Sequence, residues 1–159
     1  MKKKCVIIPF IVLFIDQLIK YLITSNFSLY EEKIIINNFF SLLYVRNIGA
    51  GFSILSGEVL FLAFISLAII IGIIYYLIKD KNIKKLEYIL YLILIGGILG
   101  NLIDRVVRGY VVDYLSFNFF GYSYPVFNFA DICIVISILS IIFLGIKDDK
   151  NANKSEWKW

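Results

Sequence analysis

The sequence predicts an all-α integral membrane protein with four transmembrane helices and a small β-rich subdomain outside the membrane. Three observations lead to this fold class: the apolar composition, the length of the apolar runs and the positions of the lysines. Of the 159 residues, 60% are hydrophobic, and the mean hydropathy of +0.85 lies well above that of soluble domains. We therefore expect residues 1–159 to form a single membrane domain.

Four apolar runs are long enough to cross a bilayer, since a helix needs about 20 apolar residues to span the hydrocarbon core. The expected spans cover residues 5–24, 59–78, 86–103 and 127–146. The first run begins like a secretory signal peptide, but it continues past Asp16 and Lys20 without a small-residue cleavage site. We therefore expect this segment to remain as the first helix.

The lysines indicate the orientation of the four spans. Eleven of the sixteen basic residues lie at the N-terminus, between the second and third spans, or in the C-terminal tail at 147–159. A protein with four spans places these three segments on the same side, and the positive-inside rule makes that side cytoplasmic. The net charge of +4 therefore indicates contact with membrane lipids, and we expect no nucleic-acid partner.

The two outer loops and the tail differ in composition. The loop at 25–58 is rich in β-branched and aromatic residues broken by Asn, Gly and charges, which predicts short strands. The loop at 104–126 is rich in Tyr and Phe, which is typical of anchoring at the membrane interface. The cytoplasmic tail at 147–159 is polar and ends with Trp157 and Trp159, so we expect it to be mobile or to lie on the membrane surface.

Asp113 and Asp131 are the strongest candidates for chemistry. Each is a lone carboxylate within an apolar, aromatic stretch, GYVVDYLSF and PVFNFADICIVIS, where an ionised side chain without a partner costs several kcal/mol. The chain has no histidine, which excludes His-based triads, His-ligated zinc and imidazole proton shuttles. A pair of carboxylates remains for acid–base chemistry, and we expect neither a metal nor another cofactor.

Other charged residues stand near the ends of the predicted spans. Asp16 and Lys20 are spaced i, i+4 and share one helical face, where an ion pair would stabilise the first helix or help to hold the outer loop. Asn101 and Arg105 have the same spacing. Asp104 at an outer helix end is typical of a solvated cap, whereas Arg105 paired with a buried carboxylate is a sharper hypothesis.

Small residues mark two places of close approach. Gly96, Gly97 and Gly100 form a stripe that permits tight helix contact in membranes. In RNIGAGFS, Gly49 lets the backbone approach another chain closely, and the amide of Asn47 is suited to hydrogen-bonding a peptide. A glycine turn would explain the second pattern equally well.

Five ordered motifs, DQLIK, RNIGAGFS, GGILGNLIDR, GYVVDYL and FNFAD, resemble those of the bacterial lipoprotein signal peptidases, also called signal peptidase II. The resemblance extends from Asp16 to about Ile146. It implies an aspartic-protease pair at Asp113 and Asp131, near the outer face of the bacterial cytoplasmic membrane. Supporting residues within the matching motifs are expected to be Asp16, Lys20, Asn47, Gly49, Asn101, Arg105, Asn128 and Ala130. Gly51 stands where many relatives have alanine, which predicts looser packing in that loop.

The substrate that the resemblance implies is a prolipoprotein whose cysteine already carries diacylglyceryl, cut just before that cysteine. We expect a monomer in which the two carboxylates share one proton, so that one acts as base toward a water while the other hydrogen-bonds the scissile carbonyl. Two other classes of function stay open from the residues alone. Intramembrane carboxylates also occur in proton-coupled transporters, and the glycine stripe would suit a membrane assembly factor without catalysis.

Overall fold

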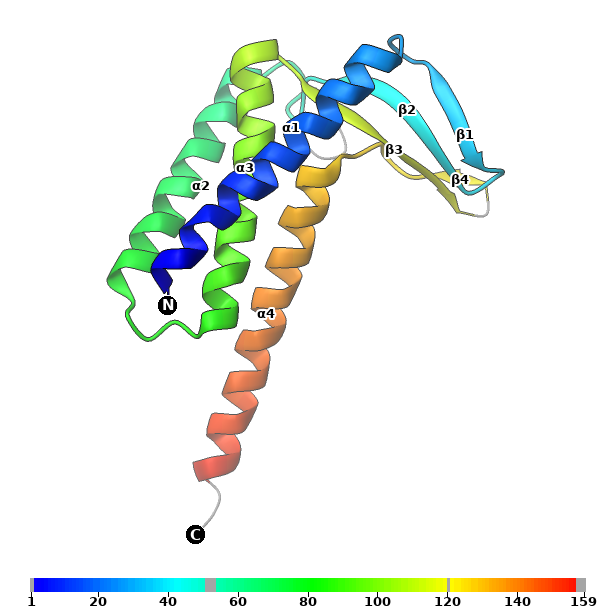
Figure 1. Ribbon diagram of the computed structural model, residues 1–159. Helices are drawn as coiled ribbons and strands as arrows, with labels where there is room; N and C mark the ends of the chain where they lie inside the picture. Colours follow the sequence, from blue (N-terminus) through cyan, green and yellow to red (C-terminus); the bar gives the residue numbers. More distant parts are fainter. Residues whose placement is uncertain (1, 51–53, 120, 157–159) are drawn as a thin grey trace.

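The computed structural model describes residues 2–50, 54–119 and 121–156 of the chain. Four long helices form a bundle, and a four-stranded antiparallel sheet extends sideways from one end of it (Figure 1). The helices are α1 (Ile8–Asn26), α2 (Val59–Lys79), α3 (Lys85–Arg108) and α4 (Phe129–Glu156), and a 3-10 helix at Lys2–Ile7 precedes α1. The strands are β1 (Glu32–Ile36), β2 (Phe40–Asn47), β3 (Val111–Phe119) and β4 (Tyr122–Ser123).

Each predicted span falls on one of the four helices. Within the described residues, four helical segments are long and apolar enough to cross a membrane. Their outward side chains are apolar as well: Phe14, Leu60 and Ile78 are 66%, 79% and 74% exposed, which suits a surface in contact with lipid. The predicted fold class is thereby confirmed.

Two helices depart from the predicted bounds. α3 continues past residue 103 to Arg108, and Gly109 ends it in the left-handed conformation, at φ +77°, that glycine adopts without strain. α4 begins at Phe129, and its backbone stays helical to Glu156. The segment expected as a mobile or surface-lying tail therefore continues the helix as far as Glu156, because extending a formed helix needs no new nucleus. The two terminal Trp residues lie outside the described residues.

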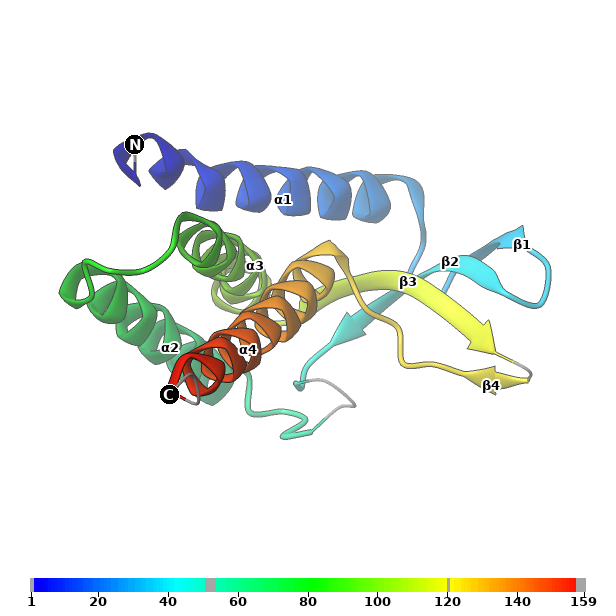
Figure 2. The ribbon, with the colours of Figure 1, turned by 90° about the horizontal axis from the view of Figure 1, so that it is seen from below.

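α3 packs against the other three helices and forms the centre of the bundle (Figure 2). A Cβ atom added at Gly97 would lie 2.8 Å from the carbonyl oxygen of Ala130. Gly100 leaves no room for a Cβ atom beside the carboxylate of Asp16. These glycines therefore let α1 and α4 approach α3 closely, as the stripe in the sequence indicated.

The sheet is built from both outer loops, whereas the sequence predicted strands in the first loop alone. β1 and β2 come from the loop at 25–58, and β3 and β4 come from the loop at 104–126, in the spatial order β1-β2-β3-β4. The aromatic residues of the second loop pair across strands, as Phe117 does with Phe40. β-Branched and aromatic side chains fit a pleated sheet, so this composition also serves strand pairing, and anchoring at the membrane interface stays a prediction.

The pairing of β2 with β3 brings polar residues of the two outer loops together. Asn47, the last residue of β2, lies opposite the first residue of β3. Side chains alternate along a strand. Val112 and Tyr114 pack in one cluster with Ile23 of α1, and Asp113 therefore points to the other face of β3. The register thus directs Asp113 and Asn47 toward α3 and α4.

Candidate active site

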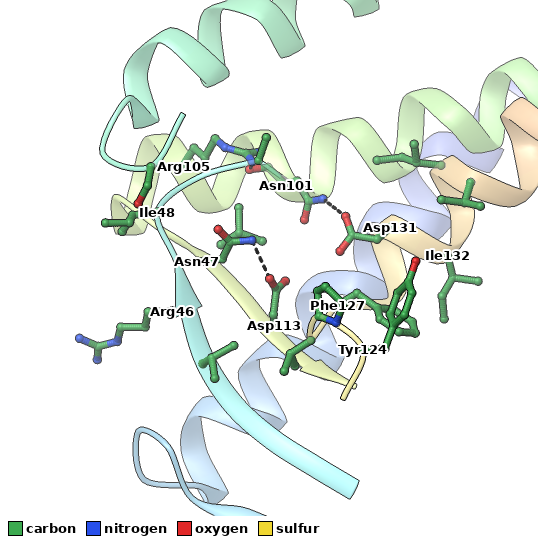
Figure 3. A pocket seen from close by; sticks show the side chains of 18 of the residues that line it. Arg46, Asn47, Ile48, Asn101, Arg105, Asp113, Tyr124, Phe127, Asp131 and Ile132 are labelled. Carbon is green, nitrogen blue, oxygen red and sulfur yellow. Dashed lines mark hydrogen bonds between the residues drawn. The ribbon is translucent and has the colours of Figure 1, made fainter. Parts of the chain in front are cut away.

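A cavity of about 670 Å³ lies where β2, β3, α3 and α4 meet. Asp113 from β3 and Asp131 from α4 both line it (Figure 3). Asp113 is 2% exposed, and Asp131 is partly buried. The structure therefore places the two lone carboxylates of the sequence on the same cavity.

The first turn of α4 fixes the position of Asp131. The backbone N–H of Asn128 donates to Asp131 Oδ2 at 3.1 Å, and the N–H of Asp131 donates to Asn128 Oδ1 at 3.0 Å. This reciprocal pair is a capping box, which provides partners for N–H groups at a helix start. Asn101 of α3 donates its Nδ2 to Asp131 Oδ1 at 2.7 Å. Both carboxylate oxygens of Asp131 therefore accept a hydrogen bond.

Asp113 also accepts a hydrogen bond at each carboxylate oxygen. Asn47 Nδ2 donates to Oδ2 at 2.9 Å (Figure 3), and Asn128 Nδ2 donates to Oδ1 at 2.6 Å. Burial, followed by the nearby negative charge of Asp131, raises the pKa of Asp113 to about 7. The two amide hydrogen bonds lower this pKa because they stabilise the ionised form. Asp113 therefore keeps its proton up to about neutral pH.

Asn128 joins the two carboxylates through a single side chain. Its Nδ2 donates to Asp113 Oδ1, and also to Asn101 Oδ1 at 3.1 Å. Its Oδ1 accepts the backbone N–H of Asp131. Asn128 is fully buried, so water does not compete for these hydrogen bonds. One amide group thus sets the position of both carboxylates.

Lys20 lies at the centre of a group of buried charges beside the cavity. Its Nζ lies 2.8 Å from Asp16 Oδ2 and 2.9 Å from Asp104 Oδ2. All three side chains are fully buried, and buried charges are stable only when they are paired and hydrogen-bonded. Lys20 Nζ also donates to Asn101 Oδ1 at 2.9 Å. This contact leaves the amide nitrogen of Asn101 directed toward Asp131.

Asp16 connects α1 with the start of α4. Its Oδ1 accepts the backbone N–H of Ala130 at 3.1 Å. Ala130 is 0% exposed, and its Cβ lies 3.4 Å from the place that a Cβ would take at Gly100. The ion pair with Lys20 that the spacing predicted is therefore present. Through further contacts of the same two side chains, it also connects α1 with α3 and α4.

The structure corrects the prediction for Asp104, which was expected to be a solvated cap. Asp104 is fully buried, because α3 continues for another turn beyond it and packs that turn against α1. Its carboxylate pairs with Lys20 and Arg108. It also accepts hydrogen bonds from Gln17 Nε2 at 3.0 Å and from the backbone N–H of Val112 at 3.1 Å. Sequence reasoning missed Gln17 and Arg108, although the i, i+4 spacing of Asp104 and Arg108 was a signal.

Arg105 supports the outer loop: among the described residues it forms no direct ion pair with a buried carboxylate, although its charge acts on those of Asp131 and Asp113. Its Nη2 donates to the carbonyl oxygen of Gly49 at 2.9 Å, and its Nη1 donates to that of Asn101 at 3.4 Å. The loop after β2 thus offers the carbonyl group of Gly49 to the guanidinium. Asn47 Oδ1 accepts the N–H of Gly49 at 2.9 Å, which fixes the same loop. Gly51, expected to loosen it, lies outside the described residues.

The residues around the cavity suit acid–base chemistry by two carboxyl groups. Asp113 holds a proton near neutral pH, whereas Asp131 lies at the start of α4, where the helix dipole stabilises a negative charge. Two carboxyl groups in different settings therefore line the same cavity, an arrangement that suits acid–base activation of a water molecule. Among the described residues, no group of three or more His, Cys, Asp or Glu is arranged to hold a metal ion.

The chain is similar to known proteins over nearly its whole length. The family model described as signal peptidase (SPase) II matches residues 8–147. The lipoprotein signal peptidase of Staphylococcus aureus strain MRSA252 is 38% identical over 149 residues, which cover 94% of this chain and 91% of that protein. The lipoprotein signal peptidase of strain JH9 is 37% identical, with the same coverage of both chains.

Two solved structures have the same fold. A bacterial membrane enzyme determined at 2.3 Å resolution has a TM-score of 0.87 and 36% identity, covering 94% of this chain and 91% of that one. A second bacterial membrane enzyme structure, at 1.9 Å resolution, has a TM-score of 0.82 and 36% identity, covering 92% of this chain and 94% of that one. The bundle and its sheet are therefore shared with membrane enzymes.

Proposed function

Because this chain belongs to the signal peptidase II family, we propose that it removes the signal peptides of prolipoproteins, with Asp113 and Asp131 as its catalytic pair. The family makes it a multi-pass membrane aspartic peptidase. One observation carries the assignment of the pair. Both carboxylates line one cavity, and both are hydrogen-bonded to Asn128.

The proposed reaction follows from the different settings of the two carboxyl groups. Asp131, whose charge the start of α4 stabilises, acts as base and takes a proton from a water molecule. The water oxygen forms a bond to the scissile carbonyl carbon, while protonated Asp113 donates a hydrogen bond to the carbonyl oxygen. The carbon–nitrogen bond then breaks, and the proton held by Asp131 passes to the leaving amine. The pair ends with one proton between its two members, as it began.

The apolar wall of the cavity supports the proposal that the substrate reaches the site from the bilayer. Ile132, Val135 and Ile136 of α4 line the cavity. Val135 and Ile136 are 53% and 57% exposed, so this wall continues onto a surface suited to lipid. We propose that the substrate is a prolipoprotein with a diacylglyceryl-modified cysteine, and that cleavage occurs just before this cysteine.

The supporting residues act on the catalytic pair or on the elements around it. Three amides orient the carboxylates, namely Asn47, Asn101 and Asn128. Arg105 and Gly49 hold the loop after β2 beside the cavity. Asp16 and Lys20 anchor α1 to α3 and α4. Ala130 permits this close approach because a larger side chain would meet α3.

We also propose that the enzyme lies in the bacterial cytoplasmic membrane with its active site near the outer face. The sheet and the start of α4 lie at one end of the bundle, and the start of α1, the end of α4 and the α2–α3 connection lie at the other (Figure 1). That connection is rich in lysine, and the positive-inside rule makes its side cytoplasmic. We expect a monomer in contact with membrane lipids, with residues 1–159 as one domain and no cofactor.

One preparation separates the peptidase from the proton-coupled transporter, which finds no support among the matched relatives. The purified protein in detergent is incubated with diacylglyceryl-modified prolipoprotein, and mass spectrometry follows the products. We expect a free signal peptide and a shortened protein that begins at the lipidated cysteine. Proton flux into protein-containing liposomes, without any release of the signal peptide, would contradict the proposed function.

A further inference from the structure

The first N–H group of α4 is held by a residue that sequence reasoning missed. A helix start leaves N–H groups without partners inside the helix. The N–H of Phe129 donates to the hydroxyl oxygen of Tyr114 at 3.1 Å. Tyr114 directly follows Asp113 in β3, and this position was the only signal that the sequence offered.

Tyr114 is hydrogen-bonded to both chain neighbours of Asn128, the residue that joins the two aspartates. After Asn128, the N–H of Phe129 donates to the Tyr114 hydroxyl. Before Asn128, the carbonyl oxygen of Phe127 accepts the backbone N–H of Tyr114 at 3.0 Å. The chain on either side of Asn128 is therefore tied to one residue of β3, and Asp113 is the neighbour of that residue.

The side chain of Tyr114 does not face the cavity. Tyr114 is 3% exposed and packs in a cluster with Ile23, Tyr44 and Val112, on the face of β3 opposite Asp113. Burial raises the pKa of its hydroxyl, so this group stays neutral at working pH. Any influence of Tyr114 on the reaction must therefore pass through the position of other residues.

We propose that Tyr114 is a positioning residue, which holds the start of α4 against β3 and thereby sets Asp131 in its working position relative to Asp113. The inference rests on the proposed function of the two aspartates as a catalytic pair. Without the hydroxyl, the N–H of Phe129 loses its partner, and the first turn of α4 is free to shift. A displacement of about 1 Å at a reacting group lowers rates by up to about a hundredfold.

The test compares two buried tyrosines of the same cluster. Tyr114→Phe removes the hydroxyl that binds α4 and keeps the ring. Tyr44→Phe is the matched control, because Tyr44 is 4% exposed and its hydroxyl accepts a hydrogen bond from Arg46 Nε at 3.2 Å. Both variants and the unaltered protein are purified in detergent. Thermal unfolding gives their stability, and kcat and KM for diacylglyceryl-modified prolipoprotein are measured on the monodisperse fraction.

We expect kcat of Tyr114→Phe to fall by about tenfold to a hundredfold, with KM changed by less than about twofold, while Tyr44→Phe keeps the kcat of the unaltered protein. A purely structural role would lower the Tm of both variants and leave kcat per folded molecule unchanged in both. That result would overturn the inference. Failure of the unaltered protein to cleave would instead contradict the proposed function, and the inference would fall with it.

Discussion

The bundle contains two buried regions that are stabilised by different forces. The apolar core lies between α2 and α3 and consists of Ile70, Leu92, Leu94, Ile95 and Ile98. The buried polar cluster lies toward the sheet and joins α1, α3, β3 and α4; its members are Asp16, Lys20, Asn101, Asp104, Asp113 and Asn128. Both regions are buried, and the second, unlike the first, holds charges within helices that are apolar enough to span the membrane.

The two regions differ in how strictly each position is specified. In an apolar core, side chains of similar volume replace one another at modest cost, about 1.5 kcal/mol or less. In a polar cluster, each charge or amide needs a partner in the right place, because an unpaired buried polar group is strongly unfavourable. A change in the polar cluster should therefore affect the fold and the site together, whereas a change in the apolar core should affect stability alone.

The largest effect is expected from Lys20→Met, which keeps most of the side-chain volume and removes the charge. Asp16 and Asp104 would lose the cation between them, and breaking a buried ion pair costs about 3–5 kcal/mol. The Tm in detergent and the yield of folded protein should fall sharply. Ile95→Val in the apolar core is the reference, with an expected cost of about 0.5–1.5 kcal/mol and no change in kcat.

A double variant tests the cause of this loss. Lys20→Met combined with Asp16→Asn neutralises one of the carboxylates that the single change leaves unpaired, so part of the lost Tm should return. Equal Tm values for Lys20→Met and Ile95→Val would contradict the proposed difference between the two regions, since the charge would then contribute no more to stability than a methyl group.

The next largest effect is expected at Gly97, where α3 and α4 approach each other closely. A Cβ at Gly97 would lie 2.8 Å from the carbonyl oxygen of Ala130 and 3.0 Å from Ile134 Cγ1. Gly97→Ala should therefore cost about 1–3 kcal/mol and also lower kcat, because α4 carries Asp131. Gly72→Ala is the matched control, since a Cβ there meets no described atom within 4 Å. If both variants unfold at the same temperature, the close approach of α3 and α4 is not what the glycine provides.

A smaller effect is expected in the pH dependence. The mechanism needs the proton on Asp113, whose pKa is raised to about 7, so kcat/KM should fall as the pH rises through that value. Asn47→Ala removes a hydrogen bond that lowers this pKa. The falling limb should then move to higher pH by up to about one unit, equivalent to about 1.4 kcal/mol. A limb that moves to lower pH would show that Asn47 does not stabilise ionised Asp113.

The features that could be predicted from the sequence are those with local signals. A span needs only a run of about 20 apolar residues, and no other chain segment has to be known. Asp113 and Asp131 were noticed because each stands alone in an apolar stretch. Their placement on one cavity followed from a resemblance in motifs, since the spacing along the chain does not say how β3 and α4 meet.

The features that could not be predicted depend on partners distant in the chain. Asp104 looked solvated because its partner Lys20 lies on α1, and only the packing of α3 against α1 buries the two together. The pairing of β3 with β2 depends on register, which neither loop encodes alone. Tyr114 lies in a stretch that is typical of any strand. Its proposed role depends on the hydrogen bond that its hydroxyl accepts at the start of α4.

The most direct test of the central claim, that one proton shared by Asp113 and Asp131 drives the reaction, is the cleavage rate of Asp113→Asn, Asp131→Asn and the double variant. Asn has nearly the same shape as Asp but neither takes up nor releases the proton. Each single variant should fold, bind lipidated prolipoprotein and cleave it about 10⁴-fold more slowly or worse. The double variant should be hardly slower than either, because the two groups act in one chemical step. Substantial turnover by either single variant, or losses that add in the double variant, would contradict the account.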